Sequence, residues 1–333
     1  MTAAAGDGGA PLLRVERLTT HYRVRRGAPG ASRLTAVRAV EDVSFTVERG
    51  EMVGLVGESG SGKSTVGRSI ARLETATSGR VVFDGEDVLA FGEAALQRYR
   101  RRMQVIFQDP ASSLDPRMRV GAIVGEPLAV HRLGDRAQRR ERVEALLREV
   151  GLGPDALRRY PREFSGGQRQ RIGIARALAA GPDLIIADEP VSALDVSVQA
   201  QVINLLQALR QRSGLALLFI SHDLPTVEFL CDRVVVMYLG RVVEIAPAAD
   251  FQQAARHPYS RRLASDAPRF GVRLASPGES VQGPPPGLLA PAEGCVFRPL
   301  CPHAIAACGQ APPVLTPMSP GHAVACIRTE LLS

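Results

Sequence analysis

Short apolar runs alternate with helical patterns through the middle of the chain. The runs at 52–56, 184–187 and 215–220 carry no charged or polar side chain, and helical patterns follow at 64–73 and 166–180. Strands that are apolar throughout are buried on both faces, as in a parallel sheet that helices cover on both sides. The pattern therefore predicts an α/β fold with a parallel central sheet.

The regions around this core have different patterns. From 12 to 47 short β-rich runs alternate with turns, residues from about 111 to 162 are mostly helical, and 234–238 with 241–245 resembles a hairpin. Further short strands are expected at 81–83 and 105–107, and an amphipathic helix at 139–150. We expect a disordered start at 1–10 and a main domain at 11–245, with a helical subdomain at about 111–162.

The composition changes after residue 245. Residues 246–333 hold 14 of the 24 prolines, including three in succession at 284–286. Proline interrupts both helices and sheet ladders, so this segment cannot be mainly helix or sheet. We expect a loop-rich C-terminal extension at 246–333, separate from the α/β core.

Charge and composition narrow the class of protein. The 41 basic residues exceed the 34 acidic ones, and all but Lys63 are arginine. Alanine, glycine, arginine and proline are all abundant, so a biased composition explains why arginine replaces lysine. The net positive charge is therefore weaker evidence of nucleic-acid binding. A lysine that survives the bias is expected where a flexible point charge works and a rigid guanidinium does not.

No apolar run approaches the roughly 20 residues that a membrane span needs. The start shows no basic segment followed by an apolar one, which a secretory signal would have. We therefore expect a cytosolic chain with reduced cysteines.

Lys63 lies in a motif for binding phosphate. The stretch Gly57, Glu58, Ser59, Gly60, Ser61, Gly62, Lys63, Ser64, followed by Thr65, matches G-x-x-x-x-G-K-[ST], the Walker A pattern, between a predicted strand and a predicted helix. Its glycines allow backbone N–H groups to point at phosphate oxygens, and the helix N-terminus adds positive potential. Lys63 would reach the β- and γ-phosphates, and the Ser64 hydroxyl would ligate Mg²⁺.

Two carboxylates follow the apolar strand at 184–187. Asp188 is placed to hold Mg²⁺, directly or through water. Glu189 points elsewhere because successive strand residues face opposite sides, and it is a candidate general base for the attacking water.

A second anion-binding helix end is expected near residue 165. Ser165 with Gln168 forms a capping-box pattern, and Gly166 and Gly167 leave the helix N-terminus bare. The two phosphate-binding helix ends need not face the same nucleotide.

These motifs together resemble those of ATP-binding cassette (ABC) ATPases. Ser165–Gln168 is similar to the family signature, Gln108 to its glutamine loop, and His222 to its switch histidine. The D-loop resemblance covers Ser192, Ala193, Leu194 and Asp195, where Asp195 could instead be only a helix N-cap. Tyr22 sits where the family places an aromatic ring against adenine, or is simply part of a strand. The resemblance implies an ABC nucleotide-binding domain: a RecA-like parallel core with an antiparallel β subdomain and a helical subdomain.

The resemblance also implies a mechanism. Two such domains pair head to tail, so that each ATP lies between the phosphate loop of one and the signature helix of the other. Gln108 would sense the γ-phosphate and Mg²⁺, and His222 would fix the water that Glu189 activates. ATP would close the dimer and hydrolysis would reopen it.

Two features resemble one branch of the family, the ATP-binding (F-type) subunits of oligopeptide/dipeptide importers. One is the His257-Pro258-Tyr259 element, and the other is the stretch from Gln108 to Met118. This resemblance implies a translocase that powers peptide import from the cytoplasmic face of the inner membrane, as a peripheral subunit. It implies as partners two transmembrane permease subunits, a homologous ATPase subunit in a heterodimer and, indirectly, an external solute-binding protein. No nucleic acid is expected.

Two alternatives stay open. A nickel or other small-solute importer of the same group would share these features, because the permease and the external binding protein select the solute. A soluble ABC ATPase acting on nucleic acid would fit the basic charge, although neither a long coiled-coil insertion nor a second cassette is present.

Four of the five cysteines cluster near the end, at Cys295, Cys301, Cys308 and Cys326. They resemble the cysteine-bearing tail of the same importer subunits, which implies a [4Fe–4S] cluster. Four thiolates also suit Zn²⁺, and the spacing alone does not decide between them. The remaining alternatives are reduced thiols without metal, or disulfides formed on purification. Cys231 is expected to be a buried small hydrophobe.

Overall fold

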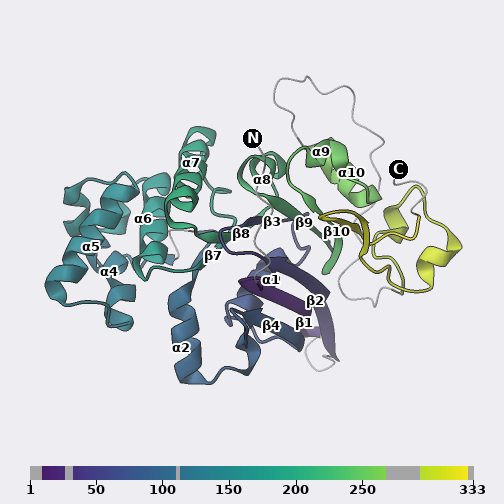
Figure 1. The fold of residues 1–333 in the computed structure, drawn as a ribbon, viewed down its shortest axis with the longest axis horizontal. Helices are drawn as coiled ribbons and strands as arrows, with labels where there is room; N and C mark the ends of the chain where they lie inside the picture. The colour runs from purple at the N-terminus through teal and green to yellow at the C-terminus, as the bar shows by residue number, and fades with distance from the viewer. Residues whose placement is uncertain (1–9, 27–32, 110–112, 268–292, 329–333) are drawn as a thin grey trace.

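The computed structural model describes residues 10–26, 33–109, 113–267 and 293–328 (Figure 1). Apart from Ala10, the predicted disordered start lies outside these residues, as do the prolines at 284–286. Among the helices described, none is long and apolar enough to cross a membrane.

The centre of the molecule is a sheet whose strands run parallel, as the apolar runs predict. Its parallel part has the order β9 (Arg233–Tyr238), β3 (Met52–Val56), β8 (Ala216–Ser221), β7 (Leu184–Asp188) and β6 (Met103–Ile106). Every residue of β3, β7 and β8 is buried. The carboxyl ends of these strands therefore meet at one edge, where ligands bind in open α/β sheets.

A second, antiparallel sheet lies against the first, below it in Figure 1. It has the order β2 (Arg33–Val47), β1 (Leu13–Arg26), β4 (Ser78–Phe83) and β5 (Glu86–Asp87). This sheet confirms the β subdomain that the family resemblance implies.

The helices fall into two groups. Helices α4 (Val120–Val130), α5 (Arg136–Glu149) and α6 (Gly166–Ala179) pack together at one end of the molecule (Figure 1). The others are α1 (Lys63–Ile70), α2 (Glu93–Arg102), α7 (Val196–Ser213), α8 (Leu224–Leu230), α9 (Phe251–Ala254) and α10 (Pro258–Asp266). Short 3₁₀ turns cover Val88–Ala90, Pro154–Arg158, Pro161–Glu163, Arg298–Leu300 and Ala306–Gly309.

The two faces of the central sheet pack against different layers. Val53 and Leu55 of β3 belong to the apolar cluster shared with the antiparallel sheet and α1. Met52 and Val56, on the opposite face, belong to the cluster formed with helices α4 to α10. This alternation follows from the two-residue period of a strand.

The C-terminal extension is not separate from the core, which corrects the expectation drawn from its prolines. After β10 (Arg241–Pro247) the sheet continues antiparallel into β12 (His322–Val324) and β11 (Thr316–Ser319). Phe297 is also buried in the core cluster. Proline limits regular structure in this segment, but the residues of β12, which include no proline, suffice to pair with the open edge of β10. Pro317 lies in β11, the outermost strand, where proline is tolerated.

One buried carboxylate ties the extension to the sheet. Glu244 of β10 is fully buried and accepts hydrogen bonds from the backbone N–H groups of Arg256 and His257, at 2.8 and 2.9 Å. Its Oε1 also lies 2.7 Å from His322 Nε2. Three donors from two distant segments thus surround this single side chain.

Candidate functional site

The predicted phosphate loop forms the floor of a cleft of about 750 Å³ at the carboxyl edge of the central sheet. The cleft lies where β3 ends and α1 begins. Its lining residues are Tyr22, Val37, Ala39, Gly57, Glu58, Ser59, Gly60, Gly62, Lys63, Ser64, Thr65, Gln108, Glu189, His222 and Leu263. Most of the residues predicted from the separate motifs are therefore brought together here.

The loop needs glycine and lysine at their observed positions. Gly62 has φ +99°, and a Cβ there would lie 2.1 Å from the Ala39 carbonyl oxygen. Lys63 is 4% exposed, and its ammonium donates to the carbonyl oxygens of Gly57 and Glu58, at 2.7 and 2.9 Å. Burial lowers the pKa of Lys63, while the acidic groups nearby favour its charged form. A thin ammonium reaches these acceptors inside the loop, where a planar guanidinium would not fit.

Ser64 and Asp188 form an oxygen pair suited to Mg²⁺. The Ser64 hydroxyl donates to Asp188 Oδ1 at 2.7 Å, and Asp188 is 4% exposed. Burial raises the pKa of Asp188, which means that a buried carboxylate here gains from a cation. A hydroxyl beside a carboxylate is the hard-oxygen donor set that Mg²⁺ prefers, so these residues fit the predicted metal.

Glu189 lies between the glutamine and the histidine that the family resemblance groups with it. Gln108 Nε2 donates to Glu189 Oε2 at 3.1 Å, and His222 Nδ1 is 3.4 Å from Glu189 Oε1. Glu189 has φ +46°, a left-handed conformation that is uncommon outside glycine and is typical of functional sites. Three side chains from three strand ends thus converge on one edge of the cleft.

Tyr22 reaches the cleft from β1. Its hydroxyl is 3.5 Å from Thr65 Oγ1, and its ring is half-buried. The position is compatible with stacking on a base, and this role stays a prediction.

The signature residues lie elsewhere, at the exposed N-terminus of α6. Ser165 Oγ accepts from Gln168 N–H at 3.3 Å and Ser165 N–H donates to Gln168 Oε1 at 3.0 Å, which confirms the capping box. A Cβ on Gly167 would lie 2.1 Å from Val198 of α7, so that glycine permits close helix packing. None of these residues lines the described cleft.

The predicted D-loop, Ser192 to Asp195, lies between Glu189 and helix α7. Ser192 Oγ donates to the Glu189 carbonyl oxygen at 3.1 Å, while Ala193 is exposed and Leu194 is half-buried. Asp195 occupies the N-cap position of α7, but its side chain makes no capping hydrogen bond. Capping therefore does not account for this carboxylate.

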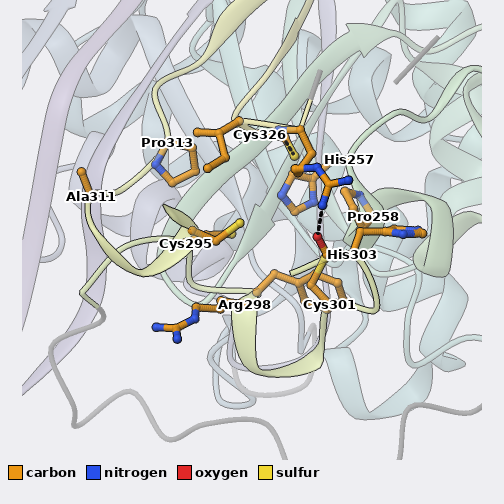
Figure 2. A pocket seen from close by; sticks show the side chains of 13 residues that line it. His257, Pro258, Cys295, Arg298, Cys301, His303, Ala311, Pro313 and Cys326 are labelled. Carbon is orange, nitrogen blue, oxygen red and sulfur yellow. Dashed lines mark hydrogen bonds between the residues drawn. The ribbon is translucent and has the colours of Figure 1, made fainter. Parts of the chain in front are cut away.

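The predicted iron–sulfur cluster is wrong, and so is its zinc alternative. Within the described part of the chain, no group of three or more His, Cys, Asp or Glu side chains is arranged to hold a metal ion. Cys295, Cys301, Cys308 and Cys326 do line one pocket, which Figure 2 shows with three of them approaching from separate segments.

The size of this pocket accounts for the absence of such a site. It has about 20 Å³ of free space, close to what one water molecule needs and far less than a cluster. Cys295 and Cys301 instead pack against the core cluster of the protein. Cys231 is buried in the core, as expected.

Sequence reasoning missed a contribution from the C-terminal extension to the cleft. Leu263 of α10 is one of its lining residues, and the Tyr259 hydroxyl accepts a hydrogen bond from the Glu58 N–H at 2.9 Å. The His-Pro-Tyr element was recognised as a motif, but nothing in its pattern indicated a contact with the phosphate loop.

Comparison with known proteins places these features in one family. Residues 40–192 match the ABC transporter family, and residues 243–308 match the C-terminal region of oligopeptide/dipeptide transporters. A putative peptide import ATP-binding protein of Brucella ovis is 51% identical over 96% of this chain and 99% of its own length. The oligopeptide transport ATP-binding protein AppF of Bacillus subtilis is 44% identical over 98% of this chain and 99% of its own.

Solved structures agree in fold. A dimeric ATP-binding cassette, MJ0796, in a post-hydrolysis state with ADP and phosphate, superposes with a TM-score of 0.63 at 28% identity, covering 72% of this chain and all of its own. CbiO1 of Clostridium perfringens, part of the transporter complex cbiONQ, gives 0.61 at 26% identity, over 72% of this chain and 89% of its own.

Proposed function

This chain belongs to the ABC transporter family of ATP-hydrolysing cassettes, and we propose that it powers the import of di- and oligopeptides. The ATPase assignment follows from the family. The peptide substrate is supported by the printed functions of its relatives and by the match at 243–308 to the oligopeptide/dipeptide transporter region.

In the proposed mechanism the phosphate loop holds ATP through its backbone N–H groups and Lys63. The Lys63 ammonium lies against the β- and γ-phosphates, and Tyr22 stacks on the adenine. Ser64 and Asp188 would hold Mg²⁺ with Gln108 beside them, and this ion would neutralise part of the negative charge of the triphosphate.

The hydrolytic step is carried by Glu189 and its two neighbours. Glu189 accepts a proton from a water molecule whose oxygen attacks the γ-phosphorus, while the bond from that phosphorus to the bridging oxygen breaks. The products are ADP and phosphate. His222 and Gln108, which contact the two oxygens of Glu189, orient the carboxylate and the water.

We further infer that a complete site needs a second chain. Ser165, Gly166 and Gln168 are exposed at a helix end outside the cleft, with Gly167 buried against α7, so within one chain these residues do not line the site of Lys63. A helix N-terminus facing the triphosphate of a partner would add positive potential where one lysine neutralises only part of the charge. The D-loop, which contacts Glu189, would lie in the same interface.

The assembly would contain two transmembrane permease subunits and a homologous ATPase subunit, with an external solute-binding protein delivering the peptide. The chain would act as a peripheral subunit at the cytoplasmic face of the inner membrane. Its cassette would span 11–245 and its extension 246–333.

The observation that carries this proposal is the convergence of Gln108, Glu189 and His222 beside the Lys63 loop. The test is uptake of labelled di- and oligopeptides by a strain that lacks this chain. The wild-type chain should restore uptake, and Lys63→Arg, expressed to the same level, should not. Restored uptake of nickel but not of peptides would overturn the peptide substrate.

A further inference from the structure

Helix α10 of the C-terminal extension lies against the phosphate loop. The Tyr259 hydroxyl accepts a hydrogen bond from the Glu58 N–H at 2.9 Å, across 201 residues of sequence. Arg262 Nη2 lies 3.7 Å from Glu58 Oε1, and Leu263 lines the cleft. Positions 259, 262 and 263 share one face of a helix, so α10 presents a single surface to the loop.

Tyr259 is fixed from the side of the extension. Its side chain is fully buried, with its ring centroid 4.4 Å from that of Tyr238 and 5.5 Å from that of Phe297. Its N–H donates to Nδ1 of His257 at 3.1 Å, which caps α10. Because these partners leave the ring little freedom, its hydroxyl is held at one place relative to the loop.

The contacted residue begins the curl of the phosphate loop. Glu58 follows Gly57, and its carbonyl oxygen accepts one of the hydrogen bonds of Lys63, at 2.9 Å. The backbone of Glu58 thus contacts the extension through its N–H and the lysine through its carbonyl oxygen. Fixing this segment also fixes the direction of the N–H groups that follow it in the loop.

We propose that Tyr259 is a positioning residue for ATP binding, through which the extension holds the phosphate loop in its nucleotide-binding conformation. This inference rests on the proposed ATPase function and assigns to the extension a part in that site. Tyr259 acts through Glu58 and takes no part in the chemical step. In the free protein, the hydrogen bond to this hydroxyl already restrains the loop. The loop therefore loses less conformational entropy when a nucleotide binds.

The test is Tyr259→Phe in the full chain, which keeps the ring and removes the hydrogen-bond acceptor. The dissociation constant for Mg·ATP, measured by titration calorimetry, should rise about fivefold, as expected for the loss of one neutral hydrogen bond. Affinity for ADP should fall by the same factor, since both nucleotides carry the phosphates that the loop binds. At saturating ATP, kcat should stay within about twofold, so that KM alone changes.

Tyr238→Phe is the matched control. Tyr238 stacks on Tyr259, and its own hydroxyl is buried with no hydrogen-bond partner within the described part of the chain. This variant perturbs the same aromatic cluster but should leave the affinity for ATP unchanged.

Two outcomes would overturn the positioning role. One is an unchanged affinity in Tyr259→Phe, whether or not its unfolding temperature falls, and the other is an equal loss of affinity in both variants. Failure of the ATPase function on which the inference rests looks different, because the wild-type chain itself would then not bind ATP.

Discussion

The cleft and the cysteine pocket each gather side chains from distant parts of the sequence, with opposite outcomes. In the cleft, Lys63 follows the end of β3 and Glu189 follows the end of β7, and both line the same volume. Asp188, the last residue of β7, accepts a hydrogen bond from Ser64, the residue after Lys63. In the cysteine pocket, four thiols also meet, but in a space of about 20 Å³ and without the geometry of a metal site. Proximity of suitable side chains is therefore not sufficient for a site.

The difference lies in what surrounds the groups. The groups of the cleft face an open volume and one another, and they include a glutamate with strained backbone. Those of the pocket are enclosed by packed side chains such as Phe297 and His257, and burial raises the thiol pKa of Cys295 and of Cys301. Substitutions should therefore affect catalysis in the first region and stability in the second.

The largest effect is expected for Lys63→Arg. The buried ammonium donates to acceptors inside the loop, and a guanidinium is too wide for that space. We expect kcat for ATP hydrolysis to fall about 1,000-fold, as when a preorganised charged donor is lost, with little change in unfolding temperature. The reverse exchange, Arg212→Lys on the exposed surface of α7, is the control, and its kcat should stay within about twofold of that of the wild type. A Lys63→Arg variant that keeps a tenth of wild-type turnover would contradict the assignment.

Glu244→Ala should lower the stability of the protein, whereas Lys63→Arg lowers its turnover. It leaves the backbone N–H groups of Arg256 and His257 and the His322 ring without their common acceptor in the interior. We expect a loss of about 3 kcal/mol in the free energy of unfolding, measured by denaturant titration, because buried donors to a carboxylate are left unpaired. Exposed Glu141→Gln is the control, and an equal, small effect in both variants would show that Glu244 does not hold the extension.

A smaller effect is expected on the pH dependence of stability, through His257 beside the cysteine pocket. Burial lowers the pKa of His257 to about 4, whereas an unfolded histidine titrates near 6.5. The unfolded chain then binds more protons, so the stability that neutral His257 contributes is complete above about pH 6.5 and is lost as the pH falls toward 4.

His257→Asn removes this titration and keeps a side-chain acceptor for the Tyr259 N–H. Between pH 7 and pH 5 the wild type should lose about 2 kcal/mol more than the variant. Parallel loss of stability in both proteins would show that His257 does not cause the pH dependence.

The sequence predicts structure well where a motif directly precedes or follows a regular helix or strand. Strand β3 has the predicted bounds Met52–Val56, and helix α6, predicted at 166–180, ends one residue earlier. Phosphate loops and strand-end carboxylates are readable because the parallel sheet carries them to one edge.

The contacts of the extension could not be predicted in this way. The pairing of β12 with β10 joins residues almost 80 positions apart, and the contact of Tyr259 with Glu58 spans 201. Neither is encoded by periodicity, and a high proline content suggested separation instead. Spacing alone likewise gave no sign that the cysteine pocket is too small for a cluster.

The central claim is that Glu189 activates water in a site completed by a second chain, and one measurement tests it directly. Glu189→Gln should bind ATP with Mg²⁺ and abolish turnover, and light scattering should show it as a stable ATP-dependent dimer. Adding Ser165→Arg to the same chain should spare ATP binding but abolish the dimer, because the exposed helix end could no longer approach the phosphates of the partner. Near-normal hydrolysis by Glu189→Gln, or a dimer that survives Ser165→Arg, would contradict the account.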